Sequence, residues 1–167
     1  MPKLIKYKEV IVDGWTLVKE ADIEPDQIQE GYWILPFSLY KSFAEQGRGM
    51  TRFGFWLNND ATLEEVKPFI HEVQVIAVEF PVFTDGRGFS LARSLRDRYD
   101  YSGELRAFGY FLPDQLFYMN RCGFDAFSLA DDVSDGEVAE MIGRFNDFSE
   151  TYQAAVDDPQ PLFRKRA

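Results

Sequence analysis

The sequence predicts an α/β protein with a mostly parallel sheet of about five strands flanked by helices, as an open sheet or a partial barrel, and with an N-terminal β-hairpin. Two observations lead to this fold class. Short apolar runs alternate with amphipathic stretches, a rhythm typical of βαβ units. Right-handed crossovers between such units leave few arrangements other than helices on a parallel sheet. The 167 residues fit one domain, residues 1–167, with no room for a second core.

The predicted hairpin opens the chain. Residues 4–12 alternate partly between apolar and polar side chains. The pair Asp13 and Gly14 that follows is a strong signal for a two-residue turn. Residues 15–18 can supply the second strand. We therefore expect strands on either side of Asp13 and Gly14.

Two strand and helix pairs follow the hairpin. Residues 31–36 form a short apolar run that predicts a strand, and the next helix is expected over residues 37–45, with Gly47 as its stop. Residues 52–57 predict the second strand. Residues 62–65 fit a capping box, in which Thr62 caps a helix and Glu65 returns a bond to its backbone.

Three more strands are predicted downstream. Residues 73–80 are almost continuously apolar, as expected of a strand covered on both faces. Residues 91–99 carry apolar side chains at helical spacing. Residues 105–109 predict the next strand, and a helix over 113–123 follows, with proline in its first turn and glycine at its end. Residues 125–129 predict the last strand.

The C-terminal region is expected to be a long helix and a tail. Ser134 and Glu137 fit a second capping box, and apolar residues continue at helical spacing to Phe148. We expect a flexible tail over residues 157–167. Within it, residues 161–166 combine an apolar anchor with three positive charges and could dock on a partner. The alternative is a disordered solubilising end.

Composition excludes several classes of function. A formal net charge of -10 argues against nucleic acid as the main partner and disfavours an anionic membrane surface. No apolar run approaches the roughly 20 residues of a membrane helix, and no signal-peptide core is present, so a cytoplasmic location is expected. Cys122 is the only cysteine and His71 the only histidine, so no iron–sulfur or metal motif can be recognised, and the cofactor is unknown.

The most informative segment is the junction over residues 79–90, where an apolar strand passes through Gly86-Arg87-Gly88 into an amphipathic helix. Ligands of open α/β folds bind outside the carboxyl ends of the strands, where helix N-termini favour anions. The loop therefore predicts a site for a sulfate, phosphate or carboxylate group, and the alternative is a glycine turn with a solvated arginine. The predicted ligand-binding residues are Thr84, Asp85, Gly86, Arg87, Gly88 and Ser90.

Catalytic residues cannot be assigned from the pattern alone. Glu79 and Asp85 lie near the carboxyl end of a predicted strand, where a general acid or base could be placed. Arg87 or Arg106 could then stabilise developing negative charge. The alternative is a structural ion pair with Arg87, Arg93 or Arg106. The candidates for catalysis are therefore Glu79, Asp85 and Arg106, without a specified nucleophile.

The chain also resembles a known bacterial family. The resemblance is carried by residues 75–93, Val-Ile-Ala-Val-Glu-Phe-Pro-Val-Phe-Thr-Asp-Gly-Arg-Gly-Phe-Ser-Leu-Ala-Arg, and continues through residues 103–107, 114–118 and 121–127. These segments are similar to the domain-of-unknown-function family nine hundred and thirty-four, whose members are labelled probable oxidoreductases involved in sulfite reduction. The resemblance is specific over roughly residues 73–128 and loose elsewhere.

The resemblance implies a role in sulfur assimilation. It suggests an accessory protein of assimilatory sulfate and sulfite reduction that acts with a sulfite reductase subunit and binds a small anion of that route at the Thr84 to Ser90 loop. A first alternative is an oxidoreductase of sulfite reduction, which would need a bound or partner-supplied cofactor. A second is a non-catalytic protein-interaction module.

Overall fold

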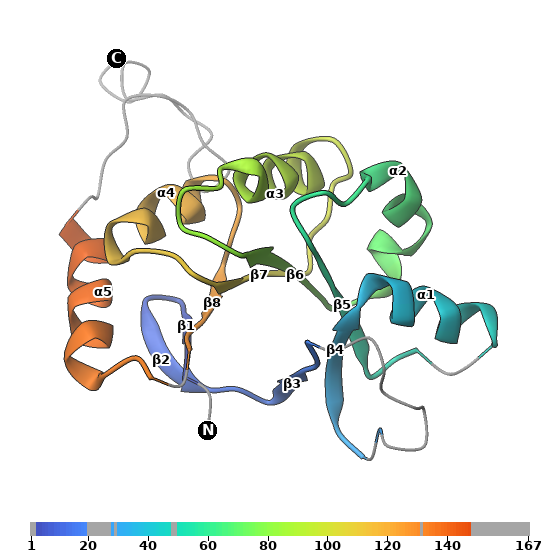
Figure 1. The fold of residues 1–167 in the computed structure, drawn as a ribbon, viewed down its shortest axis with the longest axis horizontal. Helices are drawn as coiled ribbons and strands as arrows, with labels where there is room; N and C mark the ends of the chain where they lie inside the picture. Colours follow the sequence, from blue (N-terminus) through green and yellow to red (C-terminus); the bar gives the residue numbers. More distant parts are fainter. Residues whose placement is uncertain (1–2, 20–27, 29, 48–49, 131, 148–167) are drawn as a thin grey trace.

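The structure is a computed structural model that describes residues 3–19, 28, 30–47, 50–130 and 132–147 (Figure 1). Five helices and eight strands are formed there, together with two 3-10 segments, η2 and η3. The strands are β1 (Lys3–Lys6), β2 (Glu9–Val12), β3 (Trp15–Leu17), β4 (Tyr32–Pro36), β5 (Phe53–Leu57), β6 (Val75–Phe80), β7 (Glu104–Gly109) and β8 (Ala126–Ser128). The helical segments are α1 (Phe37–Glu45), α2 (Leu63–Val66), η2 (Lys67–Glu72), α3 (Arg87–Asp97), η3 (Pro113–Gln115), α4 (Leu116–Arg121) and α5 (Asp135–Asp147).

All eight strands belong to one sheet, in the order β2-β1-β8-β7-β6-β5-β4-β3. Strands β3 to β8 run parallel, whereas β1 is antiparallel to β8 and β2 is antiparallel to β1. The α/β class is thus confirmed, but the expectation of about five mostly parallel strands is wrong. The hairpin joins the same sheet instead of standing beside it, and β3 adds a further parallel strand.

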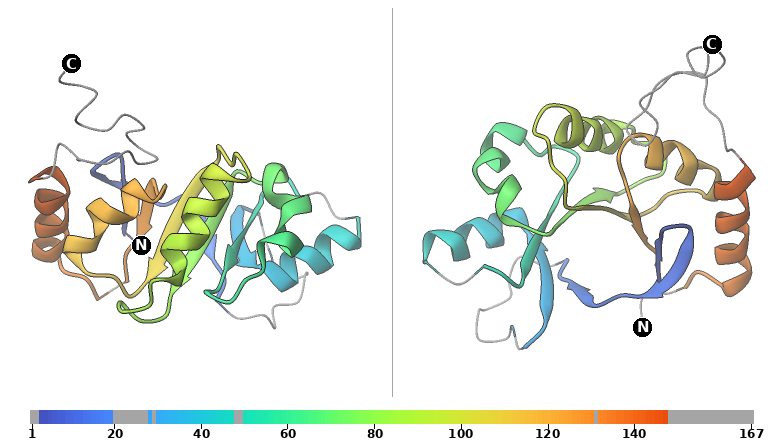
Figure 2. Two further views of the ribbon diagram at one scale, coloured as in Figure 1. Left: turned by 90° about the horizontal axis from the view of Figure 1, so that it is seen from above. Right: turned by 180° about the vertical axis from the view of Figure 1, so that it is seen from behind.

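The sheet is curled, although it remains open (Figures 1 and 2). Its two edge strands, β2 and β3, follow each other in the sequence, separated only by Asp13 and Gly14. Since consecutive Cα atoms are 3.8 Å apart, the ends of these strands lie within about 11 Å of each other. An eight-stranded sheet whose edges are tied so closely has to bend round on itself. The connection between β2 and β3 therefore imposes the curl.

The N-terminal hairpin turns at a different place from the one expected. Strands β1 and β2 pair through Lys6 and Glu9, so the turn residues are Tyr7 and Lys8. Their φ angles are 54° and 65°, which is the left-handed conformation that a two-residue hairpin requires. Asp13 and Gly14 instead connect β2 to β3, which is parallel to β4. The Asp13-Gly14 pair therefore marks the connection between β2 and β3 and not the turn of the hairpin.

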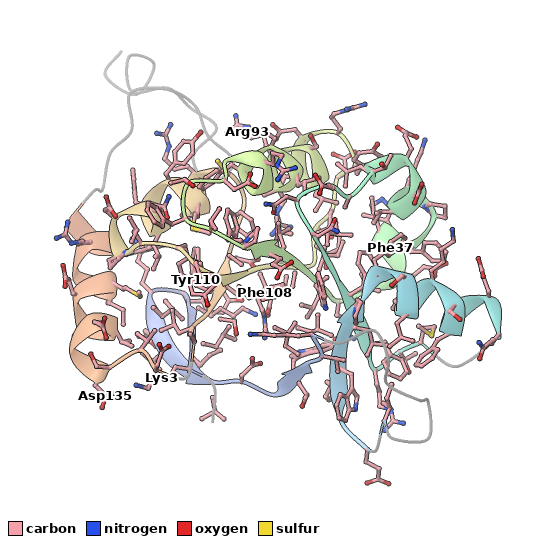
Figure 3. All side chains as sticks on the ribbon, in the orientation of Figure 1. Lys3, Phe37, Arg93, Phe108, Tyr110 and Asp135 are labelled. Carbon is pink, nitrogen blue, oxygen red and sulfur yellow. The ribbon has the colours of Figure 1, made fainter. Side chains whose placement is uncertain are left out.

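The two faces of the sheet have different surroundings. The helices cover the outer, convex face in a row (Figures 1 and 2). Their apolar sides bury one set of strand residues in the larger core, which includes Phe55, Ile76, Val78, Phe80, Ala107 and Phe127. The inner, concave face carries a smaller cluster made of Ile34, Val75, Ala77 and Phe108, with Trp15, Leu17 and Trp56 packed against it (Figure 3). Burial of both faces explains why the central strands are almost continuously apolar.

The helix signals were confirmed in part. Ser134 and Glu137 form the expected capping box at the start of α5, with the Ser134 N–H donating to the Glu137 carboxylate at 2.8 Å. Thr62 precedes α2 but makes no side-chain cap. The helix ends after four residues, and Pro68 lies in the 3-10 segment that follows it. Phe148 and the tail at residues 157–167 lie outside the described residues. Along the described ranges, no helix has both the length and the apolar character to cross a bilayer.

Candidate functional site

The carboxyl ends of β5, β6 and β7 lie next to one another, because these strands are parallel neighbours. The loop after β5 carries Asn59 and Asp60, and the loop after β6 carries Asp85 and Arg87 at the start of α3. Side chains from positions more than 25 residues apart therefore meet at one edge of the sheet. We refer to Asn59, Asp60, Asp85 and Arg87 as the loop cluster.

Arg87 is held by two carboxylates in the loop cluster. Its Nη2 donates to Asp85 Oδ2 at 2.7 Å, and its Nε donates to the same carboxylate at 3.1 Å. The remaining nitrogen, Nη1, donates to Asp60. The side chains of Arg87 and Asp60 remain 57% and 75% exposed, whereas that of Asp85 is 14% exposed. Arg87 is therefore oriented by a sheltered carboxylate and neutralised by an exposed one.

Asp85 is fixed from three directions. It accepts hydrogen bonds from the Arg87 guanidinium, from the Arg87 backbone N–H at 3.0 Å and from Asn59 Nδ2 at 2.6 Å. The hydrogen bonds from Arg87, first from its side chain and then from its backbone, hold the pKa of Asp85 far below its usual range. A carboxylate that stays ionised in this way is a poor general base. The geometry of Asp85 favours the ion-pair interpretation over acid–base catalysis.

Asn59 supports the cluster from beneath. It is 8% exposed, and among the described residues its Oδ1 atom has no hydrogen-bond partner. Sequence reasoning missed both Asn59 and Asp60. A signal was present, because the polar run Asn58-Asn59-Asp60 directly follows a predicted strand and the carboxyl ends of parallel strands meet at one edge.

The glycines of the loop have unequal roles. A Cβ on Gly88 would lie 2.7 Å from the Phe80 ring, so glycine lets the first turn of α3 pack on the end of β6. Gly86 has a φ of -84°, and a Cβ there would make only an ordinary van der Waals contact with Phe89 at 3.9 Å, which other residues would tolerate. The close approach that the sequence suggested for a ligand is taken at Gly88 by the protein's own phenylalanine.

The other predicted ligand-binding or catalytic residues are not all brought together. Thr84 is exposed in the loop. Ser90 is one turn into α3 and lines a pocket between α3 and α4, away from Arg87. Glu79 comes two residues after Ala77 on β6, so the two side chains lie on the same face of the sheet, inside the curl. Within the described part of the chain, no hydrogen bond or ion pair joins Glu79 to the loop cluster.

Arg106 lies inside the curl and does not take part in the loop cluster. Its side chain is 1% exposed and donates to Asp13 Oδ2 at 2.6 Å and to Glu104 Oε1 at 2.7 Å. Lys6 donates to the second Glu104 oxygen at 2.6 Å. Burial acts to raise the pKa of Glu104, but the charges of Arg106 and Lys6 outweigh it and lower that pKa. This geometry is that of a structural ion-pair network.

Apolar side chains are exposed on the loop that carries Asp85 and on the loop that follows β7. Gln115 joins two neighbouring loops, because its Nε2 donates to the Phe83 carbonyl at 3.0 Å and its Oε1 accepts from the Leu112 N–H at 2.8 Å. Large apolar side chains are exposed on these loops, namely Val82, Phe83, Tyr110 and Leu112. Figure 3 shows Tyr110 near Phe108, at the carboxyl end of β7. We call these four residues the apolar rim.

Potential metal ligands do not cluster in the described ranges, where no three His, Cys, Asp or Glu side chains are grouped to hold an ion. The donor set of the loop cluster agrees with this, since Arg87 already occupies the space between its two carboxylates. The arrangement suits recognition of a charged group better than metal binding.

Comparison with known proteins identifies the family. Neither the curated proteins nor the solved structures include a match to this chain. One family model does match, over residues 54–163, which covers more than half of the chain and includes the loop cluster. The protein therefore belongs to the family described as bacterial proteins of unknown function, DUF934.

Proposed function

We propose that this protein is an accessory protein of assimilatory sulfite reduction that acts with sulfite reductase and binds a small anion at the β6–α3 loop. The pathway rests on the resemblance of the loop segment to proteins with that label. The binding residues are centred on Arg87, with Thr84, Asp85, Gly86 and Gly88 around it and Ser90 one turn further along α3.

The orientation of Arg87 carries the proposal. Asn59 holds Asp85, and Asp85 holds the guanidinium, so the arginine is preorganised before a ligand arrives. Arginine has five N–H donors, and its bonds to Asp85 and Asp60 engage three of them. An anion can therefore bind the remaining N–H groups or displace the exposed carboxylate of Asp60 while Asp85 keeps the geometry.

A thermal-unfolding panel tests the anion site. Wild type and Arg87→Ala are heated with sulfite, sulfate, phosphate, adenylyl nucleotides, nicotinamide cofactors or flavins. A ligand at about 100 times its dissociation constant stabilises the folded state by roughly 2.7 kcal/mol. Arg144→Ala is the matched control, since Arg144 is an exposed arginine in an ion pair with Glu140, on α5.

The expected result is a shift with an oxyanion that is smaller in Arg87→Ala than in wild type and unchanged in Arg144→Ala. Shifts of equal size in wild type and Arg87→Ala would contradict the site. A shift with a flavin or a nicotinamide cofactor would instead favour the oxidoreductase alternative, because such a ligand brings the redox chemistry that these residues lack.

The apolar rim favours a second candidate, a non-catalytic protein-interaction module. Val82, Phe83, Tyr110 and Leu112 are exposed on two loops that Gln115 ties together. Exposed apolar groups rimmed by charge are typical of protein contacts. Co-elution with sulfite reductase tests this candidate. Loss of co-elution in Phe83→Ser, or on deletion of residues 159–167, with Arg87→Ala harmless, would favour it over the anion site.

A further inference from the structure

A pocket lies on the outer side of the molecule, between α3 and α4. Its volume is about 340 Å³, within the usual range for small-ligand sites. Its lining residues are Phe89, Ser90, Arg93, Ser94, Tyr118 and Cys122. Arg87 is not among them, so this pocket is separate from the loop cluster. We call it the α3–α4 pocket.

One wall of the α3–α4 pocket offers unused hydrogen-bond donors. Ser90 and Ser94 are four residues apart on α3 and therefore lie on the same face of the helix. Among the residues that the structure describes, neither hydroxyl has a hydrogen-bond partner. Serine hydroxyls inside a helix commonly bond back to the preceding turn, and these two do not. They are free to donate into the pocket.

Arg93 supplies the positive charge of this wall. Its Nε donates to Asp97 Oδ2 at 2.9 Å, and its Nη1 contacts the Arg121 carbonyl at 3.4 Å. Within the described ranges, its Nη2 group has no acceptor. Figure 3 shows Arg93 projecting from α3 on the side away from the sheet. The guanidinium is thus positioned by two contacts while one amino group remains available.

Tyr118 of α4, Phe89 of α3 and Cys122, which directly follows α4, form the rest of the pocket. The rings of Tyr118 and Phe89 lie 5.1 Å apart and form an apolar side to the pocket. Cys122, four residues after Tyr118, is buried and closes the floor. The Cys122 sulfur raises the pKa of Tyr118 through its charge and through a hydrogen bond, so the tyrosine hydroxyl stays protonated. No lining residue is a carboxylate.

We propose that the α3–α4 pocket binds an oxyanion, free or as the charged group of a small molecule, through Arg93 Nη2 and the hydroxyls of Ser90 and Ser94. Two hydroxyls and a fixed guanidinium form a donor-rich set that matches the acceptor oxygens of a sulfur or phosphorus oxyanion. No carboxylate lines the pocket itself, and the carboxylate of Asp97 is engaged with Arg93 Nε, which leaves Nη2 for the ligand. The pocket shares Ser90 with the proposed loop site, but its positive charge comes from a different arginine, so Arg87→Ala and Arg93→Gln separate the two sites.

The single cysteine provides the test, since alkylation of this protein can occur only at one thiol. Iodoacetamide is added to the folded full-length protein, and the rate of modification is followed by intact mass. The probes are inorganic phosphate, sulfate and methanesulfonate, each compared with potassium chloride at equal ionic strength. Sulfite is left out because it reacts with iodoacetamide itself. Because only unoccupied protein reacts, a probe at about ten times its dissociation constant slows alkylation by about tenfold.

The variants identify the residues that bind. Arg93→Gln and the double variant Ser90→Ala/Ser94→Ala are expected to lose the protection, whereas the control Arg144→Gln keeps it. Arg87→Ala also keeps it, so failure here and failure of the loop-cluster site can be told apart. Comparison of the three probes shows whether sulfur or phosphorus oxyanions are preferred.

Three results would overturn the proposal. Alkylation rates equal to those in chloride with all three probes would show that none of these oxyanions occupies the pocket. Protection that persists in both Arg93→Gln and the double serine variant would place the anion elsewhere. If the thiol does not react in the folded wild type, thermal unfolding with the same probes and variants replaces alkylation, and the absence of a shift that depends on Arg93 would overturn the proposal.

Discussion

Arg106 and Arg87 each lie between two carboxylates, but in opposite settings. Arg106 joins Asp13 and Glu104 within the curl at 1% exposure, whereas Arg87 joins Asp85 and Asp60 on the surface at 57% exposure. A buried charge that loses its partner has no water to replace it, so the Arg106 network has to stay intact. The exposed pair can exchange partners at little cost. The same ion-pair chemistry therefore stabilises the fold at Arg106, whereas at Arg87 we propose that it prepares a site for a ligand.

The largest effect is expected from Arg106→Met. This change leaves Asp13 and Glu104 buried without their main partner and should lower the free energy of unfolding by about 3–5 kcal/mol. Chemical denaturation measures the loss. Arg144→Met, which breaks an exposed pair on α5, serves as the control and should cost less than about 1 kcal/mol. Equal losses of unfolding free energy in the two variants would show that the buried ion pairs of Arg106 stabilise the fold no more than an exposed pair.

A smaller effect is expected where α3 rests on the sheet. Gly88→Ala places a methyl group 2.7 Å from the buried Phe80 ring and should lower the free energy of unfolding by about 1–3 kcal/mol through overpacking. Gly86→Ala makes only an ordinary van der Waals contact with Phe89 and should change the free energy of unfolding by less than about 0.5 kcal/mol. Thermal unfolding of both variants compares them directly. An unchanged free energy of unfolding in Gly88→Ala would show that the start of α3, which carries Arg87, is not packed tightly on Phe80.

Acid titration should separate the buried network from other carboxylates. The pKa of Glu104 is lowered from 4.5, so the unfolded chain binds the proton more tightly than the folded protein. Its contribution to stability is complete above about pH 4.5 and is lost as the pH falls through the folded pKa. Unfolding free energies measured between neutral and acidic pH should fall less steeply in Glu104→Gln than in wild type. An equal fall in unfolding free energy with pH in the two proteins would show that Glu104 does not contribute to acid destabilisation.

The smallest effect on stability is expected from Asp60→Asn. Its pair with Arg87 is largely exposed, so its loss should change the free energy of unfolding by less than about 1 kcal/mol. Anion binding should nevertheless improve, because an N–H group of Arg87 is released. Thermal shifts with sulfate or phosphate should therefore be larger than in wild type. An unchanged or smaller shift would show that Asp60 does not compete with a ligand.

The sequence predicted the local elements better than their assembly. The five strands expected between residues 31 and 129 correspond to β4 to β8, because each is an apolar run bounded by glycine, proline or polar residues. The pairing of β1 with β8 was missed, since it joins residues 120 or more positions apart. No local pattern encodes such a contact. The family resemblance was confirmed, whereas the role in sulfite reduction stays a prediction.

The candidate site shows the same division between near and distant contacts. The pair of Asp85 and Arg87 spans two residues and could be foreseen as an alternative to catalysis. Asn59 and Asp60 complete the cluster from another loop, and their approach depends on the alignment of β5 with β6. Ser90 was grouped with Arg87 because the two are close in sequence. Ser90 lines the α3–α4 pocket together with Arg93 and Ser94, whereas Arg87 does not line it.

The pairing of β1 with β8 also affects how the protein is made. The hairpin, whose buried residues Leu4 and Ile5 lie on β1, ends at Val12 and leaves the ribosome before its partner strand, which ends at Ser128. At about 5–20 residues per second, translation of the intervening chain takes roughly 6 to 23 s. During that time an apolar hairpin has no sheet to join. Nascent chains of this protein should therefore depend on chaperones most strongly before β8 is synthesised.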